Sequence, residues 1–91
     1  MALYTFMLEF NGGSYISQVK ASSPKSAIGV WAKKLNTNDI TGLGPSGKTQ
    51  LISSLKEDTP VAIAGVLNTW CSIAWMRGKL AIIYFVKTDV S

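Results

Sequence analysis

The chain has 91 residues, of which 47% are hydrophobic and 15% are charged, with nine Lys and Arg against five Asp and Glu. This length fits one domain and excludes two, because two half-sized cores would each bury too little surface. The apolar fraction excludes intrinsic disorder, and no apolar run reaches the roughly 18–20 residues of a membrane-spanning helix. The sequence therefore predicts a single domain over residues 1–91.

The residue types that the chain lacks limit its chemistry. It has no histidine and one cysteine, Cys71, which excludes a Ser–His or Cys–His nucleophile pair and a His/Cys zinc site within one chain. Among the carboxylates only Glu57 and Asp58 are neighbours, and adjacent residues face different ways on a helix. We therefore expect a non-enzymatic protein with no catalytic residues, metal or cofactor. The single cysteine and an N-terminus without early Lys or Arg favour a cytoplasmic location.

The N-terminal residues predict a β-hairpin followed by a helix. Residues 3–10 place Tyr4, Phe6, Leu8 and Phe10 on one face of a strand. Asn11-Gly12-Gly13 is a tight-turn signal, and residues 14–21 return as a second strand. Ser23 suits the N-cap and Pro24 the first turn of a helix over 24–35. Apolar residues recur at helical spacing along it: Ala27, Ile28, Trp31 and Leu35.

Residues 36–50 are rich in Gly, Ser, Thr and Asn, and a short second helix is predicted over roughly 46–57. Three strands follow, the last two joined by Arg77-Gly78-Lys79, and we expect them at 61–67, 70–76 and 80–88. The order β-β-α-(short α)-β-β-β predicts an α+β fold. Its economical form is a four- to five-stranded antiparallel sheet with the helices on one face.

The last two strands are apolar on both faces. The alternating sets are Leu80, Ile82, Tyr84 and Val86 against Ala81, Ile83 and Phe85, and Trp70, Ala74 and Met76 against Cys71, Ile73 and Trp75. Such strands need cover on both faces, whereas one long and one short helix cover one side of the sheet. Either a partner covers the second face, or the second helix and residues 36–50 wrap around it.

We favour the first alternative. The protein is then expected to act through homo-oligomerisation or protein–protein binding on an apolar sheet face, its partner being a second copy or another protein. Because both sets are apolar, the sequence leaves open which one faces outward. The candidate interface residues therefore come from both sets: Trp70, Ala74, Trp75, Met76, Tyr84 and Phe85.

Residues Gly42 to Thr49 match the phosphate-binding P-loop pattern G-x-x-x-x-G-K-[ST]. The context differs from that of a P-loop, because the preceding residues 36–41 contain one apolar residue, Ile40, instead of a buried strand. The antiparallel strands expected after it also do not suit a parallel α/β domain. We therefore expect no bound nucleotide.

The same stretch resembles the helix–hairpin–helix motif in Ile40, Gly42-Leu43-Gly44 and Leu51-Ile52. The resemblance implies a Gly-rich turn whose backbone N–H groups contact a nucleic-acid phosphate. Residues 14–56 hold six lysines against Asp39, a charge of +5. The alternative function is thus a basic module that contacts nucleic-acid phosphates through Lys25, Lys33, Gly44 and Lys48, and no membrane partner is expected.

The opening hairpin, Tyr4 to Ala21, and the helix with Ser23 and Pro24 at its start resemble the β-β-α beginning of HicB-type antitoxin domains. The resemblance implies a small, oligomeric, cytosolic regulatory protein. The chain departs from that family because the extra strand before the helix is missing.

Overall fold

The computed structural model describes residues 1–57 and 60–88 of the chain. Its elements are β1 (Ala2–Phe10), β2 (Gly13–Ala21), α1 (Pro24–Lys34), the 3-10 helix η1 (Thr37–Asp39), α2 (Gly44–Glu57), β3 (Val61–Ala62), β4 (Thr69–Met76) and β5 (Lys79–Lys87). The strands form a five-stranded sheet in the order β2-β1-β5-β4-β3, and each neighbouring pair is antiparallel. The predicted α+β fold is confirmed.

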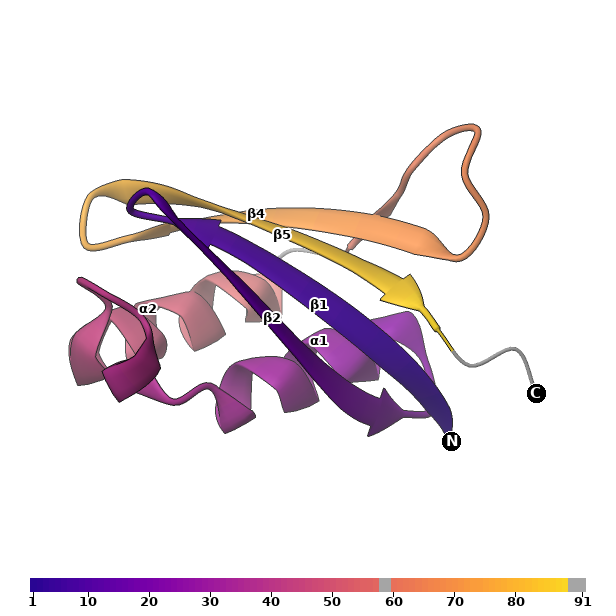
Figure 1. Cartoon of the computed structure of the whole chain (residues 1–91), viewed down its shortest axis with the longest axis horizontal. Helices are drawn as coiled ribbons and strands as arrows, with labels where there is room; N and C mark the ends of the chain where they lie inside the picture. Colours follow the sequence, from indigo (N-terminus) through magenta and orange to yellow (C-terminus); the bar gives the residue numbers. More distant parts are fainter. Residues whose placement is uncertain (58–59, 89–91) are drawn as a thin grey trace.

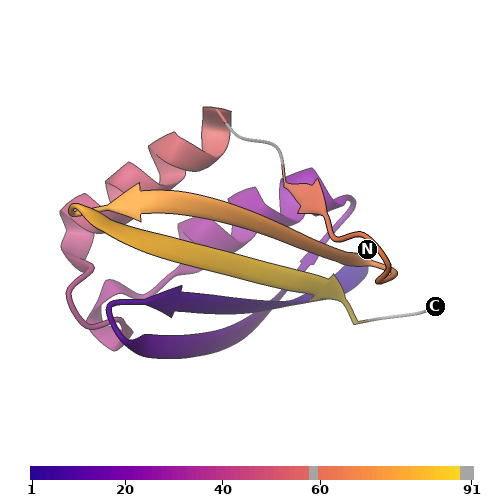
Figure 2. The ribbon, with the colours of Figure 1, turned by 90° about the horizontal axis from the view of Figure 1, so that it is seen from above.

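The molecule has two layers, one of strands and one of helices. Both helices lie beneath the sheet in Figure 1, and Figure 2 shows them behind the strands when the sheet is seen from above. The prediction that the helices occupy one face is therefore confirmed. The alternative that the second helix and residues 36–50 wrap onto the opposite face is wrong, because α2 and η1 lie on the same side as α1.

Two tight hairpins fix the register of the long strands. Asn11 and Gly12 both have positive φ, 51° and 80°, as do Arg77 and Gly78, 54° and 74°. Two consecutive positive φ angles make the two-residue turn whose twist suits a hairpin. The second turn aligns Met76 with Lys79, so the facing side chains of β4 and β5 are set by it.

Helix α1 is closed at both ends by side chains. At its start, the Ser26 backbone N–H donates to Ser23 Oγ and the Ser23 backbone N–H donates to Ser26 Oγ, each at 3.2 Å. This reciprocal pair is a capping box built from two serines. At its end, Lys48 Nζ donates to the carbonyl oxygens of Lys33 (2.7 Å) and Leu35 (2.9 Å), which the helix itself leaves without partners.

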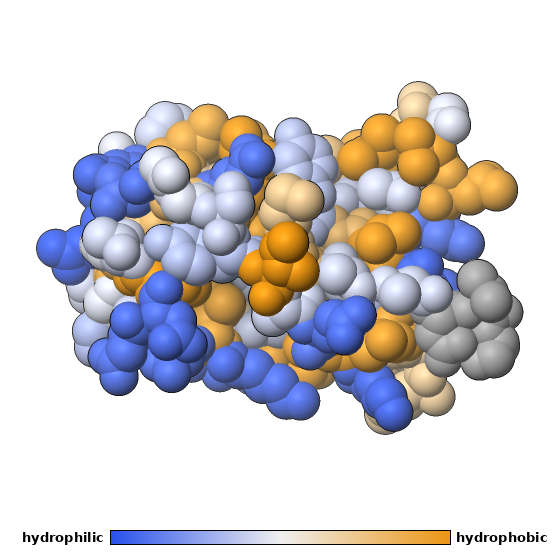
Figure 3. All heavy atoms as spheres, in the orientation of Figure 1, coloured by the Kyte–Doolittle hydropathy of each residue, from blue (hydrophilic) through white to orange (hydrophobic). Residues whose placement is uncertain are grey.

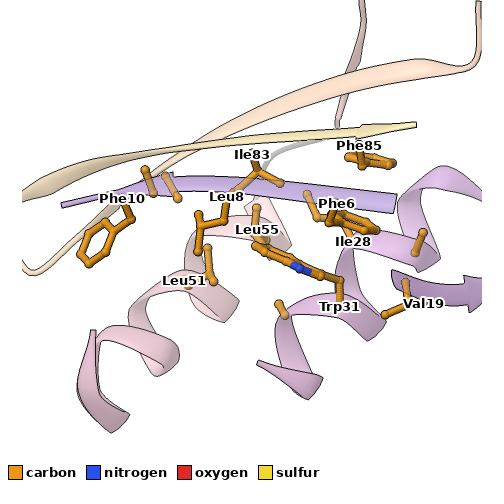
Figure 4. Close-up of a cluster of buried hydrophobic side chains, with 14 of the residues drawn as sticks. Phe6, Leu8, Phe10, Val19, Ile28, Trp31, Leu51, Leu55, Ile83 and Phe85 are labelled. Atoms are coloured by element: carbon orange, nitrogen blue, oxygen red, sulfur yellow. The ribbon is translucent and has the colours of Figure 1, made fainter. Parts of the chain in front are cut away.

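The core lies between the sheet and the helices. Phe6 is fully buried and stacks between Trp31 of α1 and Phe85 of β5, with ring centroids 5.0 and 4.5 Å apart. Figure 4 shows the side chains of β1 and β5 directed at the two helices. The residues predicted to share one face of β1 do so, and the structure shows that this face is buried: Tyr4, Phe6, Leu8 and Phe10.

Two predicted boundaries differ from the structure. The strand expected over 61–67 is two residues long, Val61–Ala62, because the chain turns at residues 63–68, where Gly65 and Asn68 have positive φ. Helix α2 begins at Gly44 instead of 46, since the Leu43 carbonyl already accepts from the Gly47 N–H at 3.2 Å. Part of the Gly-rich stretch is therefore helical.

Candidate functional site

The sheet presents one face to the helices and leaves the other bare. In a strand, successive side chains point to opposite faces, so the burial of the β1 inner set assigns the remaining residues by register. We call the uncovered side the open face. Its residues are Leu3, Thr5, Met7 and Glu9 of β1, Ser14, Ile16, Gln18 and Lys20 of β2, Val61 of β3, Thr69, Cys71, Ile73 and Trp75 of β4, and Leu80, Ile82, Tyr84 and Val86 of β5.

Large apolar side chains on the open face are exposed to solvent. Trp75 is 63% exposed, Ile73 55% and Ile16 69%. One continuous cross-strand row runs over all five strands: Ile16, Met7, Tyr84, Cys71 and Val61. A soluble monomer usually covers or breaks up apolar surface of this extent, so the open face is the strongest candidate interaction surface.

The open face carries little charge. Of the residues assigned to it, Glu9 and Lys20 are charged: Lys20 lies on the edge strand β2, and Glu9 of β1 lies beside Ile82 of β5. A hollow of about 190 Å³ lies on this face, between Met7, Tyr84 and Val86 among other residues. An apolar surface with a hollow of this kind suits an apolar side chain from a facing surface.

The structure divides the predicted interface residues between the two faces. Trp75 and Tyr84 lie on the open face, whereas Ala74, Met76 and Phe85 are buried in the core and cannot contact a partner. Trp70 is half-buried on the inner side, where the centroid of its ring lies 5.5 Å from that of the Phe85 ring. The outward set of β4 is therefore Cys71, Ile73 and Trp75, one of the two sets that the sequence left open.

Several members of the open face were not among the predicted interface residues. Six are exposed, Met7, Ile16, Val61, Ile73, Leu80 and Val86, and Ile82 is half-buried. The first two could have been identified from the hairpin alone. The alternate residues Tyr4, Phe6, Leu8 and Phe10 form the inner set of β1, so Met7 must face outward. A two-residue turn at Asn11-Gly12 then pairs Met7 with Ile16.

The residues proposed for phosphate contact do not form one site. Lys48 is committed to the end of α1 through its two hydrogen bonds, and Gly44 is the first residue of α2 with a φ of 64°. Lys25 and Lys33 line a groove between α1 and α2 instead. Within the described residues, the lysines and the Gly-rich turn therefore do not converge on a common ligand position.

The P-loop-like string does not form a phosphate-binding loop. A P-loop cradles phosphates with backbone N–H groups between a buried strand and a helix. Here Gly47, Lys48 and Thr49 are inside α2, and the 3-10 helix η1 precedes that helix instead of a strand. Thr49 Oγ1 donates to the Pro45 carbonyl at 3.1 Å, a contact within the helix. The helix–hairpin–helix motif needs a helix directly before the Gly-rich turn, and the three-residue 3-10 helix η1 stands there instead.

A second cleft, of about 480 Å³, runs between β2 and the end of α1. The Trp31 indole N–H donates to Ser17 Oγ at 3.0 Å there, and Lys34 and Asp39 are its charged lining residues. This lining does not pair an acid with a nucleophile. Across residues 1–57 and 60–88, His, Cys, Asp and Glu nowhere gather in a group of three that could hold a metal ion.

Comparisons of the chain with protein-family models, curated proteins and solved structures found no match. The resemblance to HicB-type domains therefore gains no support from a family model. In the described part of the chain, no helix has the length and hydropathy needed to cross a membrane.

Proposed function

We propose that the protein is a non-enzymatic binding protein that self-associates by stacking the open faces of two copies. The observation that carries this proposal is the exposed apolar surface of β4 and β5, centred on Ile73, Trp75 and Tyr84. Burying such side chains in a partner stabilises the complex through the hydrophobic effect.

The size of the open face suits a stable dimer. Four strands about 4.8 Å apart and about 30 Å long span roughly 600 Å² of sheet. A typical specific interface buries about 800 Å² on each partner, which is the same order of size. Two stacked sheets pack about 10 Å apart with interdigitating side chains, as in a β-sandwich.

A second copy suits the open face better than a charged partner. In a twofold dimer the same patch meets itself, so a charged patch would face its own charge across the axis. The β4–β5 part of the open face is uncharged, which avoids that repulsion. The unpaired thiol of Cys71 on this surface favours a reducing compartment, and we propose the cytoplasm.

The test compares the mass of the wild type with that of two variants by sedimentation equilibrium. Ile73→Glu places a charge in the middle of the open face, whereas Ser53→Glu places the same charge on the exposed surface of α2. We expect the wild type and Ser53→Glu at twice the 9.8 kDa of one chain, and Ile73→Glu as a folded monomer. A monomeric wild type at high protein concentration, or a dimeric Ile73→Glu variant, would contradict the proposal.

A further inference from the structure

A groove between the two helices has an apolar floor and a basic rim. Its volume is about 260 Å³, and we call it the lysine groove after its lining: Lys25, Ile28, Gly29, Ala32 and Lys33 of α1, and Ile52, Leu55 and Lys56 of α2. The helices run side by side in Figure 1, on the layer opposite to the open face, and hydrophilic residues gather along the lower edge of Figure 3 beneath them. The groove is thus separate from the proposed dimer surface.

Gly29 has no role in the packing of the chain itself. It lies in the middle of α1, where glycine is a poor helix former, and a Cβ atom there would meet nothing within 4 Å. Gly47 in α2 differs, because a Cβ atom there would come 2.8 Å from Leu43 Cδ1. The packing of the chain therefore requires a glycine at position 47 but not at position 29. A bare backbone at Gly29 lets another element approach the groove closely.

The rim of the groove offers positive charge to a partner. Lys48 and Lys79 direct their ammonium groups at oxygen atoms of the chain itself, whereas Lys25, Lys33 and Lys56 are exposed. Lys25 and Lys33 are eight positions apart on α1, so they stand about 12 Å from each other along the helix axis. Two turns of a bound helix would lie between them.

The apolar floor and the basic rim of the groove together favour one class of partner over others. Ile28, Ala32 and Leu55 are buried beneath the groove, so the apolar contact that its floor offers comes mainly from the half-buried Ile52. A phosphodiester backbone gains little from such a floor, because it needs hydrogen-bond donors. An amphipathic helix with apolar residues on one face and acidic residues beside them matches both parts of the groove.

We propose that the lysine groove binds an acidic amphipathic helix of a partner protein. The apolar face of that helix lies on the half-buried Ile52, its backbone passes close to Gly29, and its carboxylates meet the three lysines. This site does not depend on the open face, so the two proposals fail or succeed separately.

The probe is a synthetic fluorescein-labelled helix with Leu at positions i, i+3, i+4 and i+7 and Glu elsewhere, titrated with the full chain and followed by fluorescence anisotropy. Its control has Gln in place of Glu. We expect the Glu probe to bind about tenfold more tightly than the Gln probe at low salt, and the difference to shrink as salt rises. Absence of binding by the Glu probe at low salt would overturn the proposal.

Adjacent lysines provide matched variants. Lys33 lines the groove and Lys34 does not, so Lys33→Glu should weaken probe binding about tenfold while Lys34→Glu changes it less than about twofold. Gly29→Leu should fold, because the space above Gly29 is open, and should weaken binding by filling the groove. Ile73→Glu should bind the probe like the wild type, whatever its oligomeric state.

Two results would overturn the proposal even if the probe binds. Equal losses for Lys33→Glu and Lys34→Glu would show general electrostatic attraction instead of a groove. Tighter binding of a single-stranded RNA oligonucleotide than of the Glu probe, with the same dependence on Lys33, would assign the lysines to nucleic acid.

Discussion

Phe6 is the residue on which the core depends most. It is fully buried and lies between the rings of Trp31 and Phe85, so its truncation leaves a cavity between sheet and helix. We expect Phe6→Ala to lower the free energy of unfolding by about 3–5 kcal/mol. The control Val66→Ala, in the exposed turn after β3, should change it by less than about 0.5 kcal/mol. Urea denaturation at one fixed protein concentration measures both, and similar values for the two variants would contradict this view of the core.

Lys48 belongs to the P-loop-like string, but in the structure it caps the end of α1. Its ammonium group donates to two carbonyl oxygens at the end of α1, where the helix dipole also favours a positive charge. Lys48→Met keeps the length of the side chain and removes the charge. We expect a loss of about 1 kcal/mol in the free energy of unfolding, since the side chain is half-buried and partly screened by solvent. An unchanged stability would show that Lys48 does not hold α1 and α2 together.

The outward residues of β4 could not be predicted from their own strand. Trp70, Ala74 and Met76 are as apolar as Cys71, Ile73 and Trp75, so hydropathy does not distinguish the two faces. Packing decides between them. Helix α2 lies against β4. The side chains on the helix-facing side of the sheet include the small residues Ser72, Ala74 and Ala81, which let a helix approach closely. That information depends on the position of α2, which a local pattern does not contain.

At the scale of elements, β2 is the long edge of the sheet and offers an alternative way to associate. The Leu3 carbonyl accepts from the Thr88 N–H, so the backbone groups of Leu3 point toward β5. Backbone hydrogen bonds alternate along an antiparallel strand, and the N–H and C=O groups of Tyr4, Phe6 and Leu8 therefore point toward β2. By the same alternation, the Gln18 N–H points to the free edge. Edge strands tolerate proline at such a position, and proline there removes a donor that edge pairing would use.

Gln18→Pro therefore distinguishes face stacking from edge pairing. Gln18 itself belongs to the open face, so the matched control is Gln18→Ala, which loses the same side chain and keeps the N–H. The dimer that we propose predicts the same mass for both variants in sedimentation equilibrium. Circular dichroism provides the control that the sheet is intact. A folded Gln18→Pro monomer, beside a dimeric Gln18→Ala variant, would show that copies join through β2.

The two helical glycines should respond oppositely to alanine. Gly29→Ala meets open space and gains helix propensity, so the free energy of unfolding should rise by about 0.5–1 kcal/mol. Gly47→Ala forces its Cβ against Leu43, which is fully buried, and should lower it by about 1–3 kcal/mol. Thermal denaturation of the two variants measures the contrast, and a destabilising Gly29→Ala would show that the glycine serves the fold.

Local patterns predicted most elements, and their failures have physical causes. The first hairpin and α1 carry their own signals, in the turn residues Asn11-Gly12 and the cap Ser23. The short β3 does not: Val61 to Leu67 is an apolar run, yet the chain turns away at Ile63 and leaves Leu67 88% exposed. Apolar composition was a poor guide there because the residues of the turn are not buried.

At the scale of the whole molecule, both helices of the described chain pack on one side of a sheet that is apolar on two sides. The low charge of residues 60–88, where Arg77, Lys79 and Lys87 stand alone among apolar strands, contrasts with the lysine-rich helices. The open face of the sheet is suited to burial against a second copy, whereas the helix layer presents the charged surface that holds the lysine groove. We therefore expect the open face to be buried between two copies of the chain.

Trp75 reports on that claim directly, because it is 63% exposed on the open face while Trp31 is buried and Trp70 is half-buried. The measurement is acrylamide quenching of tryptophan fluorescence at high and low protein concentration, in the wild type and in Trp75→Phe. We expect the quenching assigned to Trp75, which is the difference between the two proteins, to be small at high concentration and to rise on dilution. If Trp75 is equally quenched at both concentrations while the mass doubles, the copies associate through another surface and the account is contradicted.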